Sequence, residues 1–212
     1  MRKYIPNLLT CLNLAIGCIG IHETLVSKRI DAFYFVVMAS FFDFFDGLAA
    51  RLLKVQSAVG KQLDSLADLI SFGLLPAFFM LQLLYERSEY YLVAILIVIF
   101  SALRLAIFNV DESQNDSFKG LPTPANALML TSLIFIPFDL QVYSLISICF
   151  FSSLMLVSPI KLTALKFSSF GWVGNEERWI VILSVIIFII VFKWTFIPFL
   201  IPYYIVVSLL SN

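Results

Sequence analysis

The sequence is poor in charged residues and carries no net charge. Only 13% of its 212 residues are charged, and 14 Lys and Arg balance 14 Asp and Glu. Because about a quarter of the residues in a typical soluble domain are charged, an ordinary water-soluble fold is not expected. A chain without excess positive charge has no basic surface for nucleic acid, so no nucleic-acid partner is expected either.

Histidine and cysteine are also scarce. His22 is the single histidine, and Cys11, Cys18 and Cys149 are the three cysteines. The cysteines lie inside apolar runs without the spacing of zinc ligands, so we interpret them as small packing residues. With so little imidazole and thiolate, a zinc or copper site is not expected.

The sequence shows no internal repeat and no low-complexity tract, and a cleavable leader is not expected. The charged start Met1-Arg2-Lys3 is followed by no small-residue cleavage site, so the first apolar stretch is expected to stay in the protein. We expect one integral membrane domain over residues 1–212.

Apolar residues are what the sequence has in abundance. They make up 61% of the chain, including 22 Phe, and the mean hydropathy is +0.97. A helix that crosses ~30 Å of hydrocarbon needs about 20 mostly apolar residues. That length predicts eight spans, near residues 6–26, 32–53, 65–85, 90–110, 123–139, 142–158, 178–194 and 196–210. The expected fold is an all-α, polytopic transmembrane helix bundle of about eight spans.

The lysines and arginines near the span ends predict the orientation of the bundle. With a cytoplasmic N-terminus, the outer side holds Lys28, Arg29, Arg87 and Lys193. The inner side then holds Arg2, Lys3, Lys54, Lys61, Lys119, Lys161, Lys166 and Arg178. This excess on the inner side predicts a multi-pass protein of the cell (inner) membrane with both termini in the cytoplasm.

Four aspartates interrupt the second and third apolar stretches. Asp43 and Asp46 are three residues apart and Asp64 and Asp68 four apart, so each pair shares one helix face. An ionised side chain at membrane depth costs at least a few kcal/mol, so these acids need a cation or a water-filled cavity. Both pairs lie toward the cytoplasmic ends of neighbouring antiparallel spans, so all four carboxylates are expected to converge.

Carboxylate ligands favour hard cations such as Mg²⁺, Mn²⁺ or Ca²⁺. Four carboxylates carry enough charge for two divalent ions about 4 Å apart, an arrangement that serves phosphoryl transfer. Gly47 and Gly60 leave room for a ligand beside the backbone, and Arg51 can neutralise a phosphate. Interhelical salt bridges, or the proton path of a transporter, are the alternatives for the same acids.

These residues form one spaced motif, Asp43-x2-Asp46-Gly47-x2-Ala50-Arg51-x8-Gly60-x3-Asp64-x3-Asp68. The motif resembles that of the CDP-alcohol phosphatidyltransferase family in full. The resemblance implies an integral membrane enzyme with a six-helix core. Such an enzyme transfers the phosphatidyl group of a CDP-linked lipid to an alcohol and releases CMP.

The resemblance also implies roles for individual residues. Asp43, Asp46, Asp64 and Asp68 would bind two divalent cations, Mg²⁺ or Mn²⁺, with Ca²⁺ as a possible substitute. Asp68 would also be the base that deprotonates the acceptor hydroxyl. The nucleotide pocket would be formed by Thr10, Asn13, Gly47, Ala50, Arg51 and Gly60. The family further implies a homodimer, which no stretch of the sequence demonstrates.

Three further blocks, residues 69–77, 102–109 and 118–127, resemble the phosphatidylserine synthase branch of the family. One position departs from that branch, because Ile107 stands where a basic residue is common. The branch implies CDP-diacylglycerol and L-serine as substrates, in contact with membrane lipids and with a cytoplasmic active site.

Serine carries a carboxylate, for which Arg104 and Lys119 are the candidate ligands. Arg104 could instead pair with one of the acids, and Lys119 could be a solvated loop charge. Other acceptors, such as glycerol 3-phosphate, an inositol compound or choline, remain alternatives. So does a cation- or proton-coupled transporter, although the sequence has no paired halves typical of one.

Overall fold

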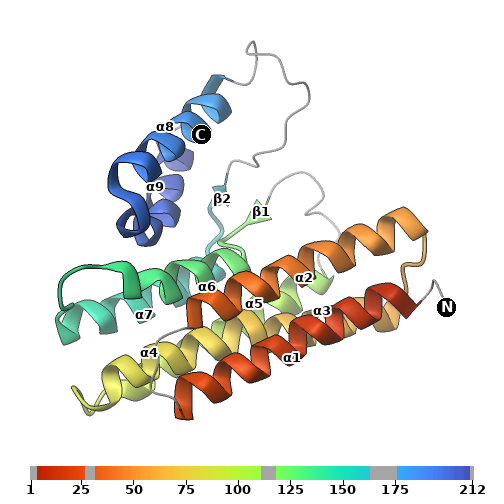
Figure 1. Ribbon diagram of the computed structural model, residues 1–212, viewed down its shortest axis with the longest axis horizontal. Helices are drawn as coiled ribbons and strands as arrows, with labels where there is room; N and C mark the ends of the chain where they lie inside the picture. The colour runs from red at the N-terminus through yellow and green to blue at the C-terminus, as the bar shows by residue number, and fades with distance from the viewer. Residues whose placement is uncertain (1–3, 27–31, 111–117, 163–175, 211–212) are drawn as a thin grey trace.

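The computed structural model describes residues 4–26, 32–110, 118–162 and 176–210, and Figure 1 shows it as a bundle of helices. The helices are α1 (Ile5–Val26), α2 (Ala32–Leu53), α3 (Ala58–Asp68), η2 (Leu69–Leu74), α4 (Leu75–Tyr85), η3 (Tyr91–Ala94), α5 (Ile95–Val110), α6 (Thr123–Thr131), η4 (Ser132–Phe135), α7 (Val142–Leu156), α8 (Glu176–Phe192), η5 (Lys193–Phe196) and α9 (Ile197–Leu210). Two short strands are β1 (Phe118–Lys119) and β2 (Lys161–Leu162).

The predicted all-α membrane fold is confirmed. Each predicted apolar stretch coincides with a helical segment. Five segments within the described residues are long and apolar enough to cross a membrane: Ile5–Val26, Ala32–Leu53, Ala58–Tyr85, Tyr91–Val110 and Leu183–Leu209. Large apolar side chains such as Phe41, Ile99 and Phe151 point outward, as expected of a protein embedded in lipid.

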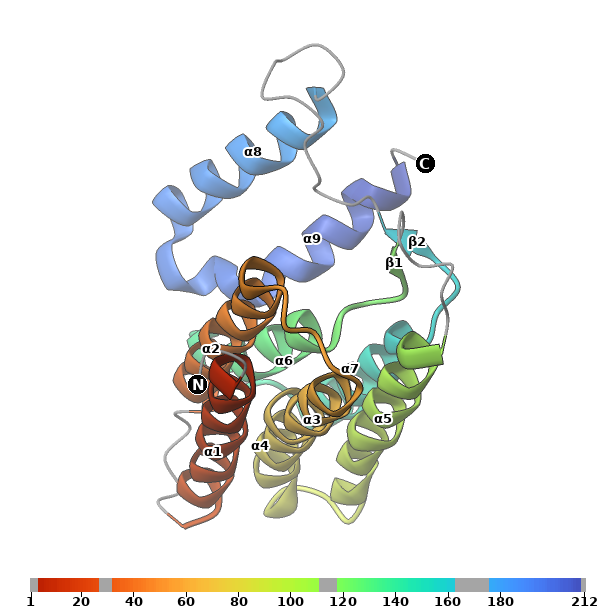
Figure 2. The same cartoon turned by 90° about the vertical axis from the view of Figure 1, so that its right-hand side faces the viewer.

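The helical segments after α5 depart from the prediction of eight full-length membrane spans. The helix of α7 has 15 residues and therefore rises roughly 22 Å, which is short of the ~30 Å hydrocarbon layer. Thr123–Phe135 is also a shorter apolar helix. The last apolar segment turns at η5, where Lys193 has a φ of 51°, and Figure 2 shows α8 and α9 as two arms of a hairpin.

The third helical segment begins at Ala58, seven residues earlier than the predicted span. Ser57 caps it, because its hydroxyl accepts a hydrogen bond from the backbone N–H of Gly60 at 3.0 Å. The polar residues before position 65, which the apolar length criterion left out of the span, are therefore helical. Asp64 and Asp68 lie on one continuous helix. Pro76 has no N–H to donate to the preceding turn, and the helix accommodates it through the π-helical segment η2, directly after Asp68.

Helix α1 packs against both α2 and α3 with a face of small and polar residues, which are Thr10, Asn13, Gly17, Gly20 and Thr24. Small residues let neighbouring helix backbones approach closely in a membrane bundle. The approach is closest at Gly17, where an added Cβ would lie 2.4 Å from Ser71 Oγ and 3.0 Å from Ser71 Cα. Contact between α1 and η2 therefore requires a glycine at this position.

The strands β1 and β2 form a two-residue antiparallel ladder that fixes the chain just before α6. Phe118 pairs with Leu162, and the Gly120 N–H donates to Ile160 O at 3.0 Å. Gly120 has a φ of +74°, and a Cβ there would lie 2.5 Å from Leu156 O, so this turn needs glycine. The ladder sets where α6 begins relative to the rest of the bundle.

Candidate functional site

The aspartates of α2 and α3 converge at the end of the bundle near the α2–α3 turn. Carboxylate oxygens of Asp43, Asp64 and Asp68 all lie within 4.8 Å of one another. Asp46 lies one turn from Asp43 on α2 and is in electrostatic contact with Asp64. The structure thus brings together the residues that the helical spacing predicted to meet.

The residues around this cluster fit a bound cation. Three carboxylates at such separations repel each other unless positive charge or protons intervene. Within the described part of the chain, the salt bridges are His22–Glu23 and Arg87–Asp139, and neither involves these aspartates. An all-oxygen donor set that forms no salt bridge within the described residues suits a hard divalent cation.

Two side chains of α1 orient the acids. The Thr10 hydroxyl donates to Asp46 Oδ2 at 2.6 Å, and Asn13 Nδ2 donates to Asp68 Oδ1 at 3.3 Å. The Ser71 hydroxyl in turn donates to the backbone oxygen of Asn13 at 3.0 Å. Hydrogen bonds of this kind hold metal-ligating carboxylates in one rotamer, so α1 contributes directly to the geometry of the cluster.

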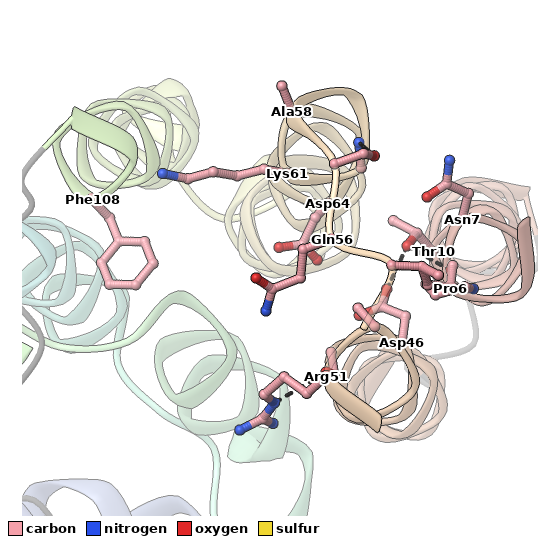
Figure 3. Close-up of a pocket in the computed structure, with 15 residues that line it drawn as sticks. Pro6, Asn7, Thr10, Asp46, Arg51, Gln56, Ala58, Lys61, Asp64 and Phe108 are labelled. Carbon is pink, nitrogen blue, oxygen red and sulfur yellow. Dashed lines mark hydrogen bonds between the residues drawn. The ribbon is translucent and has the colours of Figure 1, made fainter. Parts of the chain in front are cut away.

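A cavity of about 780 Å³ opens beside the acids, among α1, α2, α3 and the end of α5 (Figure 3). Its lining residues are Pro6, Asn7, Thr10, Asp46, Gly47, Ala50, Arg51, Val55, Gln56, Ser57, Ala58, Gly60, Lys61, Asp64 and Phe108. A volume of this order is typical of a small-molecule or cofactor site. Asp46 and Asp64 connect the cavity to the acidic cluster.

Most of the residues predicted to bind a nucleotide line this cavity, namely Thr10, Gly47, Ala50, Arg51 and Gly60. Asn13 lies deeper and contacts Asp68 instead. A Cβ at Gly47 would meet nothing within 4 Å, so Gly47 leaves open space for a ligand. Arg51 is exposed, and its Nε donates to Gly47 O at 3.1 Å.

The two residues predicted to bind the acceptor have different surroundings. Arg104 is only 9% exposed, is attracted electrostatically to Asp68, and lies 5.9 Å from the centroid of the Phe108 ring. No salt bridge to Arg104 is found in the described ranges, and its Nε is buried without a hydrogen-bond partner. The backbone of Lys119 pairs with Lys161 in the ladder, but the Lys119 side chain is outside the described part of the structure.

Sequence reasoning missed several residues of the site. Gln56 and Phe108 line the cavity, and Lys61 joins α3 to α5 by donating from Nζ to Asn109 O at 2.8 Å. Thr123 and Asn126 are buried polar side chains in the first turn of α6 that the sequence did not single out, and they are not among the residues that line this cavity. The signal that could have found them is two polar residues three apart on one face of an otherwise apolar helix.

The chain is similar to known proteins. Residues 3–163 match the model of the CDP-alcohol phosphatidyltransferase family. The chain is 37% identical over 139 residues to a CDP-diacylglycerol–serine O-phosphatidyltransferase of Bacillus subtilis, covering 63% of this chain and 76% of that protein.

Two further relatives bear the same name. One, from Helicobacter pylori, is 37% identical over 130 residues, which are 59% of this chain and 54% of that protein. The other, from Methanocaldococcus jannaschii, is 33% identical over 160 residues, which are 74% of this chain and 72% of that protein. The chain thus spans little more than half the length of the Helicobacter relative. Since the family match runs from α1 through α7 and includes every helix that lines the cavity, the chain belongs to the CDP-alcohol phosphatidyltransferase family.

Proposed function

We propose that this enzyme transfers the phosphatidyl group of CDP-diacylglycerol to the hydroxyl of L-serine, forming phosphatidylserine and CMP. The observation that carries the proposal is the acidic cluster at the edge of the cavity, with the buried cation Arg104 near Asp68. The names of the relatives support serine as the acceptor.

Asp43, Asp46, Asp64 and Asp68 would hold two divalent cations, Mg²⁺ or Mn²⁺. When bound, such ions withdraw charge from the diphosphate and stabilise the departing CMP. The chain itself keeps two of the four carboxylates, those of Asp46 and Asp68, in place through Thr10 and Asn13 of α1. Because α1 positions carboxylates that would hold the cations, we expect changes in α1 to affect activity as much as changes of the aspartates do.

In the proposed reaction, Asp68 accepts the proton of the serine hydroxyl. The serine oxygen forms a bond to the phosphorus that carries the diacylglycerol. The bond from that phosphorus to the bridging oxygen breaks, and CMP leaves with the electron pair. Arg51 and Lys61, which line the cavity, would balance the charge of the nucleotide phosphates. Arg104, which is buried on α5, would bind the serine carboxylate.

The proposed setting is the cell membrane, with both termini and the cavity on the cytoplasmic side. Support comes from the excess of Lys and Arg on the inner side and from the place of the cavity beside the α2–α3 turn. The lipid tails would then extend into the bilayer while serine arrives from the cytosol. A homodimer is part of the proposal on the strength of the family resemblance.

The acceptor is tested by measuring CMP release from CDP-diacylglycerol with different alcohols. We expect L-serine to give a rate at least about tenfold above glycerol 3-phosphate, inositol, inositol phosphate or choline, a difference of about 1.4 kcal/mol in transition-state binding. Arg104 provides one buried cation, which suits a carboxylate better than a doubly charged phosphate. A higher rate with glycerol 3-phosphate would refute the serine proposal, and no CMP release with any alcohol would favour the transporter.

The nucleotide pocket is tested at Gly47. In Gly47→Ala the new methyl group enters open space in the cavity, so the fold is retained but the ligand loses room. We expect the KM for CDP-diacylglycerol to rise about tenfold, equivalent to about 1.4 kcal/mol of binding, with little change in the KM for serine. An unchanged KM for CDP-diacylglycerol would place the nucleotide elsewhere.

A further inference from the structure

The first turn of α6 contains buried polar groups that have no hydrogen-bond partner. Thr123 is 1% exposed and Asn126 is 0% exposed, and Thr123 Oγ1 and both amide atoms of Asn126 are unpartnered within the described structure. Thr131, in the last turn of the same helix, is also 0% exposed, but its hydroxyl donates to Ala127 O at 2.7 Å. Because buried polar groups are nearly always paired, the unpaired set points to a missing ligand.

Helix α6, which carries these groups, packs against elements that carry or adjoin the acidic cluster. Helix α6 packs against α2 and against η2, which follows Asp68 directly, and it also touches α5. Figure 2 shows α6 beside α2, in agreement with the packing of these two helices. Arg104 of α5, with its own unpartnered Nε, lies by the Phe108 ring and is attracted to Asp68.

We propose that Thr123 and Asn126 form, with Arg104, the pocket that recognises the acceptor as an amino acid. The inference rests on the proposed function and assigns the recognition of the ammonium group to α6. Arg104 binds the carboxylate, while Asn126 Oδ1 and Thr123 Oγ1 accept hydrogen bonds from the ammonium. Neutral oxygens suit this task, because an additional carboxylate would pair with Arg104 and close the pocket to its ligand.

The experiment compares Thr123→Val with Thr131→Val, two nearly isosteric changes of buried threonines on one helix. Steady-state rates of the full chain are measured in detergent–lipid micelles with L-serine and CDP-diacylglycerol varied in turn. We expect Thr123→Val to raise the KM for serine about tenfold and to leave the KM for CDP-diacylglycerol within twofold. Thr131→Val should leave both KM values within twofold, because its hydroxyl is satisfied by its own helix.

Asn126→Leu provides a second measurement that a structural role would not imitate. Replacing an unpartnered buried amide by an apolar side chain of similar shape should leave the melting temperature unchanged or raise it. We expect the same variant to raise the KM for serine about tenfold. Its preference for L-serine over 3-hydroxypropanoate, which lacks the ammonium group, should fall about tenfold, whereas its preference for L-serine over ethanolamine should change less.

The outcomes separate this inference from the proposed function. If the wild-type enzyme does not use serine, the proposed function fails before any variant is made. If wild type uses serine and both Thr123→Val and Asn126→Leu keep its KM within twofold, the acceptor pocket is not at α6. A lower melting temperature with an unchanged KM would mean that the groups are structural. Should Asn126→Leu not fold, the threonine pair decides the question.

Discussion

Replacing Asp64 by Asn should lower CMP release from CDP-diacylglycerol by about a thousandfold or more while the protein remains folded. Asp64 is one of the two aspartates that line the cavity, and its carboxylate oxygen lies within 4.8 Å of those of Asp43 and Asp68. Asn has the same shape but no charge, so the change removes a cation ligand and relieves repulsion among the acids. Loss of electrostatic stabilisation at a reacting phosphate commonly costs two to three powers of ten or more.

The control for this change is Asp139→Asn. Asp139 is exposed, and its carboxylate pairs with Arg87 at 2.7 Å. Arg87 follows the end of α4, whereas Asp64 lies on α3, near the opposite end of the same helical segment. A surface salt bridge contributes about 0–1 kcal/mol, so activity and melting temperature should barely change. Thermal unfolding in detergent checks both variants. Substantial activity in folded Asp64→Asn would remove Asp64 from the mechanism.

Gly17→Ala is expected to destabilise the protein by about 1–3 kcal/mol and to lower activity with it. Alanine normally stabilises a helix relative to glycine by about 0.5–1 kcal/mol. A loss of stability in Gly17→Ala would therefore come from packing and not from helix propensity. The new Cβ would lie 2.4 Å from Ser71 Oγ and 3.0 Å from Ser71 Cα, and α1 would have to move away from η2. That movement would weaken the hydrogen bonds of Thr10 and Asn13 to the aspartates.

Two further variants make this a test of contact rather than of helix propensity. Gly47→Ala adds the same methyl group to a helix where nothing lies within 4 Å, so its melting temperature should stay level or rise. Ser71→Gly removes the side chain that the new methyl group meets, so the double variant with Gly17→Ala should recover part of the lost stability. Additive effects in the double variant would contradict a direct clash, since touching residues are expected to couple.

Much of the fold followed from local rules. Runs of apolar residues predicted where each helix would lie, because a segment in hydrocarbon must satisfy its backbone hydrogen bonds internally. The start of the third helix was misplaced because the polar turn from Lys61 to Asp64 lowers the mean hydropathy, although the Ser57 cap was readable. The shortness of α6 and α7 was not predicted, since hydropathy alone does not fix where a helix ends.

The acidic site, too, was predictable from the sequence only in part. The intervals from Asp43 to Asp46 and from Asp64 to Asp68 placed each pair on one face, and helical periodicity alone was enough for that. The hydrogen bond from Asn13 to Asp68 joins residues 55 positions apart, and no local pattern fixes the distance between α1 and α3. The unpaired state of Arg104 is likewise a property of everything packed around it.

The sequence by itself therefore determined that this protein is a membrane-embedded helical bundle whose acids fall in pairs on shared helix faces. Those properties depend on composition and on spacings of three or four residues. Within a single helix, such spacings place side chains on the same face. Only the tertiary structure decided how α1 orients the acids, how the cavity is lined, and that Thr123 and Asn126 are buried without hydrogen-bond partners. These properties depend on distances between helices, which side-chain packing across the whole bundle sets.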